Sequence, residues 1–198
     1  DKVFVQKWLG YAKQKSYAIS LAKNEWVISL DADERVTEAL KDEILSFNLD
    51  NTKYSAFKIK RENYFIGKKI NGCGWGNDYQ LRLFRKSGTR VDERLVHEKF
   101  IVEGEVAELK NPILHYSYNN LKEGFDKINV YSSLEAEEKF NKKKVSTLRI
   151  IFYPVFVFLH HYLFRKVIKD SKHGLMISLM HAVTNPQVQM KILELKQK

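Results

Sequence analysis

The sequence predicts an α/β fold followed by a helical C-terminal region. Residues 26–30 are a short apolar run that ends abruptly in acidic residues, which is typical of a buried strand in a parallel sheet where it leaves the core. Just before it, residues 13–23 carry apolar side chains at helical spacing. A similar stripe across residues 121–139 predicts that helices continue toward the C-terminus.

The composition limits the size of the core and the kinds of partner. A chain of 198 residues that is 44% hydrophobic can bury one sizeable core. The single cysteine, Cys73, excludes an internal disulfide and is compatible with a reducing compartment. The net charge is +10, and residues 121–198 carry 14 Lys and Arg against 7 Asp and Glu. This basic region indicates either nucleic acid or an anionic membrane surface as a partner.

The acidic turn after residue 30 is the first candidate site. Asp31 and Asp33 follow the predicted strand, and open α/β sheets bind ligands at the carboxyl ends of their strands. A turn can bring both carboxylates onto one hard cation, Mn²⁺ or Mg²⁺, whose coordination an anionic diphosphate completes. The alternative is a solvated turn in which Asp33 or Thr37 caps a helix over residues 37–47.

Residues 51–60 and 80–85 alternate in polarity and predict two more strands. Between them lies a glycine cluster, where Trp75 offers a stacking face for a sugar or base; a simple hairpin loop explains the same glycines. Arg82 or Arg85, on the second strand, is suited to a phosphate contact, and a cross-strand salt bridge is the alternative.

Several blocks occur in an order that resembles a known family. They are WLGYAKQK at 8–15, WVISLDADERV at 26–36, LRLFRK at 81–86, VHE at 96–98, LHYSY at 114–118 and KHGL at 172–175. Together they resemble family 2 glycosyltransferases of the GT-A type. Within that family they are similar to the bacterial enzymes that add a sugar to the lipopolysaccharide core, such as β-1,4-glucosyltransferases. Because the blocks span nearly the whole chain, they are more specific than a D-x-D motif alone.

The resemblance implies a GT-A-like, Rossmann-like core with a mixed sheet over residues 1–120. It implies a helical, basic, membrane-surface region over residues 121–198. The apolar strand followed by T-Y-N-E that opens such enzymes has no match here, although residues 3–5 form an apolar, strand-like run. We therefore expect the chain to lack the first βα units of the nucleotide half.

The resemblance also assigns roles in the donor site. It implies that Asp31 and Asp33 hold Mn²⁺ or Mg²⁺ and that His115 completes the metal site; a structural histidine is the alternative. Lys13 and Lys15, at the start of the first predicted helix, lie near the expected diphosphate. Ordinary surface lysines are the alternative there.

Inverting transfer requires a base that removes the proton from the incoming hydroxyl. By resemblance Glu98 stands at the position of that base, with His97 as its neighbour. The alternative is an exposed glutamate paired with Lys99 or Arg94. The remaining candidates for the base are Asp92 and Glu93.

The C-terminal region contains a long apolar segment. Residues 150–164 form an uncharged stretch of 15 residues, shorter than the roughly 20 that a spanning helix needs, with basic residues on both sides. A helix lying in the headgroup region fits this arrangement, and a buried helix or a dimer interface is the alternative. Nucleic acid fits less well because the aromatic residues are not interleaved with the lysines. Two amphipathic segments, 176–182 and 188–195, follow.

These expectations combine into one function. The chain is expected to transfer a hexose, with inversion, from a nucleotide sugar such as a UDP-hexose to a lipopolysaccharide core or related glycolipid. Its partners are then the donor, the glycolipid acceptor and an anionic membrane surface, without nucleic acid, at the inner face of the cytoplasmic membrane. The alternatives are a family 2 transferase that acts on a polyprenyl-linked or capsule precursor, and a non-catalytic membrane-surface binding module.

Overall fold

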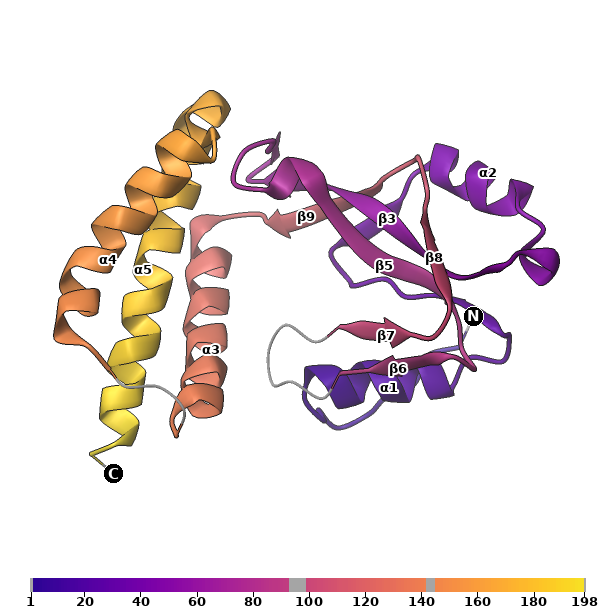
Figure 1. The fold of residues 1–198 in the computed structure, drawn as a ribbon, viewed down its shortest axis with the longest axis horizontal. Helices are drawn as coiled ribbons and strands as arrows, with labels where there is room; N and C mark the ends of the chain where they lie inside the picture. The colour runs from indigo at the N-terminus through magenta and orange to yellow at the C-terminus, as the bar shows by residue number, and fades with distance from the viewer. Residues whose placement is uncertain (1, 93–98, 142–144, 198) are drawn as a thin grey trace.

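The computed structural model describes residues 2–92, 99–141 and 145–197. It contains a curled mixed sheet with two helices beside it, and a group of C-terminal helices at one end of the sheet (Figure 1). The predicted α/β core with a mixed sheet and C-terminal helices is confirmed, and the arrangement is compatible with a Rossmann-like fold.

The main sheet is built around one long strand, β3. Five strands lie in the order β1 (Trp26–Ile28), β5 (Asp78–Arg85), β3 (Tyr54–Phe65), β9 (Ile113–Tyr118) and β2 (Glu34–Val36). Two short strands, β4 (Lys68–Lys69) and β8 (Glu105–Glu108), also pair with β3. β3 runs parallel to β8 and β9 and antiparallel to β5. A separate ribbon is formed by β6 (Thr89–Val91) and β7 (Phe100–Val102).

Two predictions for the N-terminal part are wrong. The apolar run at residues 26–30 is not a buried parallel strand, because β1 pairs antiparallel with β5 and Ile28 is 38% exposed. Only one side of this run packs inward, where Trp26 contacts Phe57. Residues 3–5 form no strand, and Val3 and Val5 are almost fully exposed.

The helices next to the sheet follow local sequence signals. α1 (Tyr11–Ser20) lies beside the β6 and β7 ribbon (Figure 1). α2 (Glu38–Ser46) is preceded by Thr37, whose hydroxyl accepts a hydrogen bond from the Leu40 backbone N–H at 3.1 Å, so the predicted Thr37 cap is confirmed. α2 covers the main core, which contains Leu40, Phe57, Ile59, Leu83, Leu109 and Ile113.

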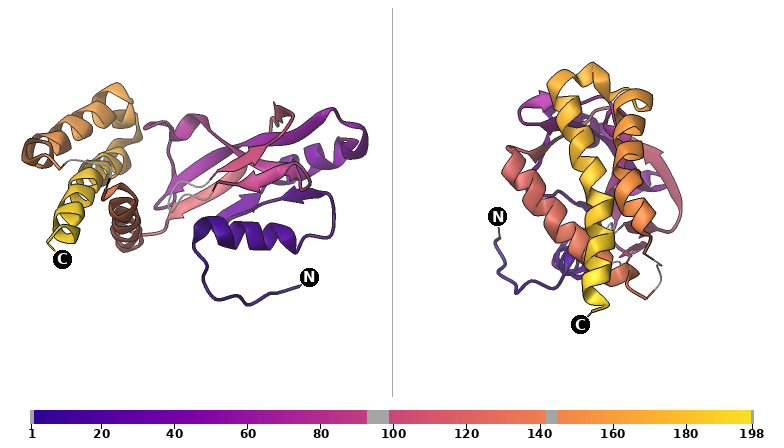
Figure 2. Two further views of the ribbon diagram at one scale, coloured as in Figure 1. Left: turned by 60° about the horizontal axis from the view of Figure 1, so that its bottom comes forward. Right: turned by 90° about the vertical axis from the view of Figure 1, so that its left-hand side faces the viewer.

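The C-terminal helices form a layer of their own. α5 (Ser171–Leu195) lies between α3 (Leu121–Lys139) and α4 (Thr147–Leu159), as the views in Figures 1 and 2 agree. The two amphipathic segments predicted at 176–182 and 188–195 are one continuous helix that includes Pro186, so that division is wrong. A second core joins this layer to the end of the sheet and contains Phe65, Ile70, Cys73, Val167, Ile177 and Met180.

α4 presents an apolar face to the outside. It continues into a π-helical turn (His160–Phe164) and a short 3₁₀ helix, η4 (Val167–Asp170). Among the described residues, the 18-residue stretch Thr147–Phe164 is long and apolar enough to cross a membrane, by length and composition alone. Its exposed large apolar residues recur at helical spacing and are Leu148, Ile151, Phe152, Val155, Phe156, Leu159, Leu163 and Phe164.

Candidate functional site: an electropositive cleft

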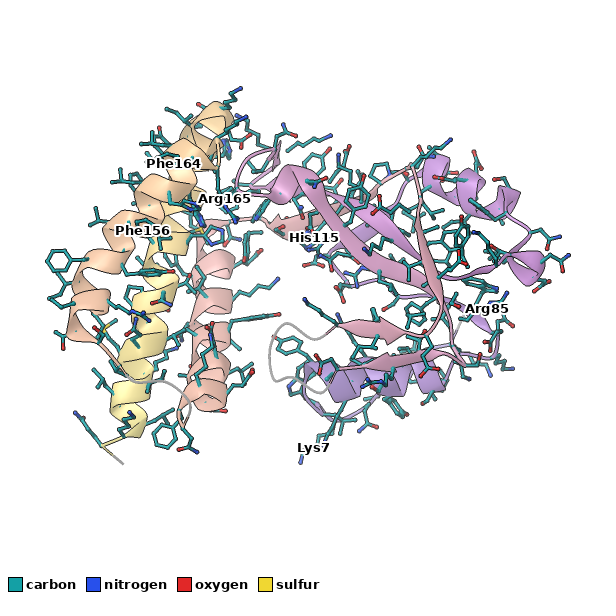
Figure 3. The ribbon with its side chains drawn as sticks, in the orientation of Figure 1. Lys7, Arg85, His115, Phe156, Phe164 and Arg165 are labelled. Atoms are coloured by element: carbon teal, nitrogen blue, oxygen red, sulfur yellow. The ribbon has the colours of Figure 1, made fainter. Side chains whose placement is uncertain are left out.

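An open cleft of about 1160 Å³ lies where the acidic turn, the sheet, α1, β7 and α3 meet. Five of the residues singled out from the sequence line it, namely Lys15, Asp31, Asp33, Arg82 and His115. They come from segments up to 100 positions apart, so they meet through the pairing of the strands and the packing of α1 beside the sheet. Figure 3 shows His115 on β9, where the sheet faces the C-terminal helices.

The antiparallel pairing of β2 with β9 places Asp33 beside His115. Glu34 is in register with His115, and the Asp33 backbone carbonyl accepts a hydrogen bond from the Tyr116 N–H at 2.9 Å. As a result His115 Nε2 lies 3.4 Å from Asp33 Oδ2, and Lys127 Nζ of α3 lies 3.9 Å from the same oxygen. Burial raises the pKa of Asp33, but the hydrogen bond with His115 and the nearby positive charges outweigh it and hold the pKa below its ordinary value.

Asp31 is held by two cations on the other side of the turn. Arg82 Nη2 lies 2.6 Å from Asp31 Oδ2, and Lys15 Nζ lies 3.2 Å from Asp31 Oδ1. The backbone N–H of Ser29 donates to the carbonyl of Arg82 at 2.8 Å, which fixes the turn against β5. Burial raises the pKa of Asp31, but the Arg82 and Lys15 charges outweigh it and hold the pKa below its ordinary value.

Glu34 is the buried anchor of the acidic turn. Glu34 is 3% exposed and Arg82 is 4% exposed, and the Glu34 carboxylate pairs with the Arg82 guanidinium. It also accepts a hydrogen bond from the Asp31 backbone N–H at 3.0 Å, and Arg61 Nη1 lies 3.5 Å away. Two buried opposite charges thereby satisfy each other and hold the turn in place.

A hydrogen-bond chain fixes the orientation of His115. The amide NH₂ of Asn63 donates to the Trp75 carbonyl at 3.1 Å and to Asp78 at 3.0 Å, so the Asn63 oxygen faces His115 Nδ1 at 2.5 Å. Nδ1 must therefore carry the proton, since the amide oxygen can only accept. Nε2 is then left facing the Asp33 carboxylate at 3.4 Å.

The donor set fits a divalent cation at Asp33 and His115. A carboxylate oxygen and a bare imidazole nitrogen are both acceptors, and a cation between them satisfies both. Asp31 lines the same cleft, but its two oxygens are engaged by Lys15 and Arg82. Among the described residues, Asp31 therefore stands beside the Asp33 and His115 pair and does not converge on it.

The lining of the cleft is strongly cationic and aromatic. Beside the two aspartates it contains seven cationic side chains, Lys15, Arg35, Lys58, Arg61, Arg82, Lys99 and Lys127. It also contains five aromatic side chains, Tyr11, Tyr79, Phe100, Tyr116 and Tyr131. Such a surface suits an anionic ligand that carries rings, because the cations attract its charge and the aromatic faces stack on its rings.

The other predicted site residues lie elsewhere. Lys13 is exposed and does not line the cleft. Trp75 lines a neighbouring, mostly apolar cavity of about 300 Å³ between the end of β3, α3 and α5. Glu98, with His97, Glu93 and Arg94, lies outside the described residues, although Lys99, the next residue in the chain, lines the cleft. Asp92 is described and does not line the cleft.

Several residues that build the cleft were missed from the sequence. They are Glu34, Arg61, Asn63, Asp78 and Lys127. Glu34 could have been selected from the sequence, because it belongs to the same acidic turn as Asp31 and Asp33. The others become site residues through pairings between distant segments, which the sequence alone does not reveal.

The chain is thus a mixed α/β protein with a cleft lined by cationic and aromatic side chains. No family model matches the chain. The chain is similar to proteins named as glycosyltransferases. It is 29% identical over 195 residues to uncharacterized glycosyltransferases of Rickettsia typhi and Rickettsia prowazekii, covering 91% of this chain and 66% of each relative.

A third relative carries a more specific name. The chain is 29% identical over 160 residues to the lipopolysaccharide core biosynthesis glycosyltransferase LpsC of Rhizobium meliloti, covering 79% of this chain and 59% of that protein. The chain thus spans less than two thirds of the length of these three relatives.

Proposed function

We propose that the protein is a glycosyltransferase of the GT-A type that moves a hexose, with inversion, from a nucleotide sugar to a lipopolysaccharide core or related glycolipid. The observation that carries the proposal is the cationic and aromatic cleft at the acidic turn, in which His115 Nε2 and Asp33 Oδ2 lie 3.4 Å apart. The similarity to named glycosyltransferases supports the same class of reaction.

In this proposal the cleft binds the donor, most simply a UDP-hexose. The cationic side chains attract the diphosphate, and the aromatic side chains offer faces to the base and the sugar. Asp33 and His115 hold Mn²⁺ or Mg²⁺, with Asp31 beside them, and the bound ion supplies charge neutralisation for the leaving diphosphate. Arg82 and Lys15 keep Asp31 in place, and Asn63 keeps His115 Nε2 directed toward the cleft.

The acceptor enters from the side of the apolar cavity. This cavity shares Lys127 and Tyr131 with the cleft, so the two spaces adjoin. Trp75 and Tyr118 line it and offer stacking faces for a saccharide. Glu98 is the proposed base that takes the proton from the acceptor hydroxyl, and its chain neighbour Lys99 lies in the cleft lining.

The exposed apolar face of α4 supports a membrane-surface location. Phe152 and Phe156 of α4 and Phe164 of the π-helical turn that follows are each more than 60% exposed. Figure 3 labels Phe156 and Phe164 on this segment, which is the helical segment farthest from the sheet. Burial of such side chains in the acyl region, together with the basic flanks, holds a helix on an anionic bilayer. The proposed location is the inner face of the cytoplasmic membrane, where nucleotide-sugar donor and lipid-linked acceptor meet.

The test is a transfer assay on vesicles. The protein is mixed with anionic vesicles that carry a lipopolysaccharide core acceptor, Mn²⁺ and a radiolabelled UDP-hexose, and labelled lipid is counted. We expect Glu98→Gln to abolish transfer and to keep donor binding, and Asp33→Asn to lose both, whereas the exposed control Asp126→Asn retains activity. Equal transfer by Asp33→Asn and the wild type would reject the proposed site.

The same assay separates the alternatives. Transfer to a polyprenyl-linked sugar in place of the core acceptor would assign a different acceptor to the same donor site. Vesicle binding without any nucleotide affinity would favour a non-catalytic membrane-surface module, which the exposed face of α4 also supports.

A further inference from the structure

A second group of metal-binding side chains lies outside the cleft. Cys73, His161 and His181 each offer one ligand atom, and these three atoms all lie within 4.8 Å of one another. Cys73 Sγ is 3.2 Å from His161 Nδ1, and the His161 and His181 ring centroids are 4.7 Å apart. Within the described parts of the chain, these three side chains form a group that could hold one metal ion.

The three residues come from three separate segments. Cys73 belongs to the glycine-rich loop, His161 to the π-helical turn after α4, and His181 to the middle of α5. Cys73 has a φ of +58°, a backbone conformation that is unusual for a residue other than glycine. π-helical turns and such conformations are found at functional sites, where the surrounding contacts stabilise them.

The surrounding hydrogen bonds hold the loop against the helices. The Cys73 N–H donates to the Arg165 carbonyl at 3.1 Å, and Arg165 Nη1 donates to the Cys73 carbonyl at 3.2 Å. The Asp170 carboxylate accepts from the backbone N–H groups of Asn71 and Gly72. Figure 3 shows Arg165 at the end of the C-terminal helices nearest this loop. The position of Cys73 is therefore fixed from both sides, as a preformed metal site requires.

A cation satisfies this group better than hydrogen bonds alone. A thiol has one weak proton to donate, so it can serve only one of the two imidazoles at a time. Burial lowers the pKa of His181 to about 4, and burial together with Arg165 lowers the pKa of His161, and both shifts favour the neutral imidazole that ligates a metal ion. Burial raises the pKa of Cys73 to about 11, so a metal ion must displace the thiol proton.

We propose that Cys73, His161 and His181 bind one Zn²⁺ ion. One thiolate and two imidazoles are ligands that Zn²⁺ prefers, whereas Mg²⁺ and Mn²⁺ prefer oxygen. Tetrahedral zinc places such ligand atoms about 3.3 to 3.6 Å apart, which small side-chain rotations reach from the present positions. Arg165 repels the ion, and the thiolate and the Asp170 carboxylate offset that charge.

The ion has a structural consequence. It joins the glycine-rich loop to α5 and to the end of α4, three segments that otherwise meet through the second core. Trp75 and His181 both line the apolar cavity, so the ion fixes one wall of that cavity. This site is distinct from the Asp33 and His115 pair, and the inference does not depend on the proposed transferase activity.

Cobalt provides the direct test, because a thiolate bound to Co²⁺ gives an intense charge-transfer absorption. The purified chain is stripped with a chelator and titrated with Co²⁺, and Zn²⁺ is then added in competition. We expect a thiolate band that saturates at one equivalent of Co²⁺ per chain and that Zn²⁺ removes, whereas any Co²⁺ bound by Asp33 and His115 gives no such band. Since Cys73 is the single cysteine of the chain, that band reports on Cys73 without any variant. No thiolate band in the wild type would overturn the proposal.

Variants identify the two histidines. His161→Gln and His181→Gln are each expected to weaken Co²⁺ binding by roughly tenfold or more. Their matched control is His160→Gln, which changes the neighbouring histidine outside the group and should keep the wild-type thiolate band. Zn²⁺ should raise the melting temperature of the wild type more than that of Cys73→Ser. Unchanged affinity in both histidine variants would overturn the ligand assignment.

Discussion

The ion pair between Arg82 and Glu34 is predicted to hold the acidic turn in place. The side chains of Arg82 and Glu34 are 5% and 0% exposed. Arg82→Met removes the cation and leaves the Glu34 carboxylate buried, with Arg61 at 3.5 Å as its nearest remaining charge. Removing one partner of a buried pair costs about 3 to 5 kcal/mol, and the nearby Arg61 places the expected loss at the lower end, about 3 kcal/mol.

Urea denaturation measures this loss. With a denaturant dependence of about 2 to 3 kcal/mol per molar for a chain of this size, 3 kcal/mol moves the midpoint by about 1 to 1.5 M. Glu34→Gln should cost less, because Arg82 keeps Asp31 at 2.6 Å as a partner. The double variant Arg82→Met with Glu34→Gln should cost less than the two single changes together, because the Glu34 charge is then no longer left without Arg82.

An exposed pair on α3 supplies the control. Lys122 and Asp126 are joined at 2.6 Å with side chains that are 85% and 63% exposed, so Lys122→Met should leave the urea midpoint unchanged. If Arg82→Met shifts the midpoint no more than Lys122→Met does, or if the losses in the Arg82 and Glu34 cycle simply add, the reasoning about the buried pair is refuted.

Three further predictions concern pH, packing and the membrane. Burial raises the pKa of Asp78, but its hydrogen bonds and the Arg61 charge outweigh burial and hold the pKa below 3.8. The Asp78 carboxylate therefore stabilises the fold above that pH, and this stabilisation is lost as the pH falls through the lower pKa of the folded state. Asp78→Asn should accordingly flatten the fall of the urea midpoint below pH 4. A methyl group on Gly174 would lie 2.0 Å from the Val167 carbonyl oxygen, so Gly174→Ala should lower the melting temperature, with a cost of about 1 to 3 kcal/mol, whereas Gly88→Ala, whose closest contact is 3.6 Å, should be tolerated. Phe156 is 61% exposed on the outer face of α4, so Phe156→Ser should weaken sedimentation with anionic vesicles by about tenfold, and unchanged vesicle binding would contradict a membrane role for that face.

The helices of this chain could be predicted because their signals are local. The stripe of apolar residues gave α3 at residues 121–139, and Thr37 marked the start of α2. Two of the three predictions that failed, at residues 26–30 and 176–195, depended on long-range packing. An apolar run at 26–30 does not reveal which strand will pair with it, and Pro186 does not interrupt α5, since neighbouring helices pack around it at that point.

The candidate site was predicted in its residue types but not in its assembly. Asp31, Asp33 and His115 could be selected as residues suited to a cation, and they do line one cleft. The register of β2 against β9, which places Asp33 next to His115, is set by the whole sheet. For the same reason the roles of Glu34 and Asn63 could not be read from the sequence, because each depends on a partner at least 48 positions away.

The most direct test of the central claim is calorimetric titration of UDP into the protein in the presence and absence of Mn²⁺. The account predicts binding that requires Mn²⁺, that is lost in the double variant Asp31→Asn with Asp33→Asn, and that is kept in the exposed control Asp126→Asn. Absence of UDP binding by the wild type, or equal binding by the double variant, would contradict the assignment of the cleft as the nucleotide-sugar site.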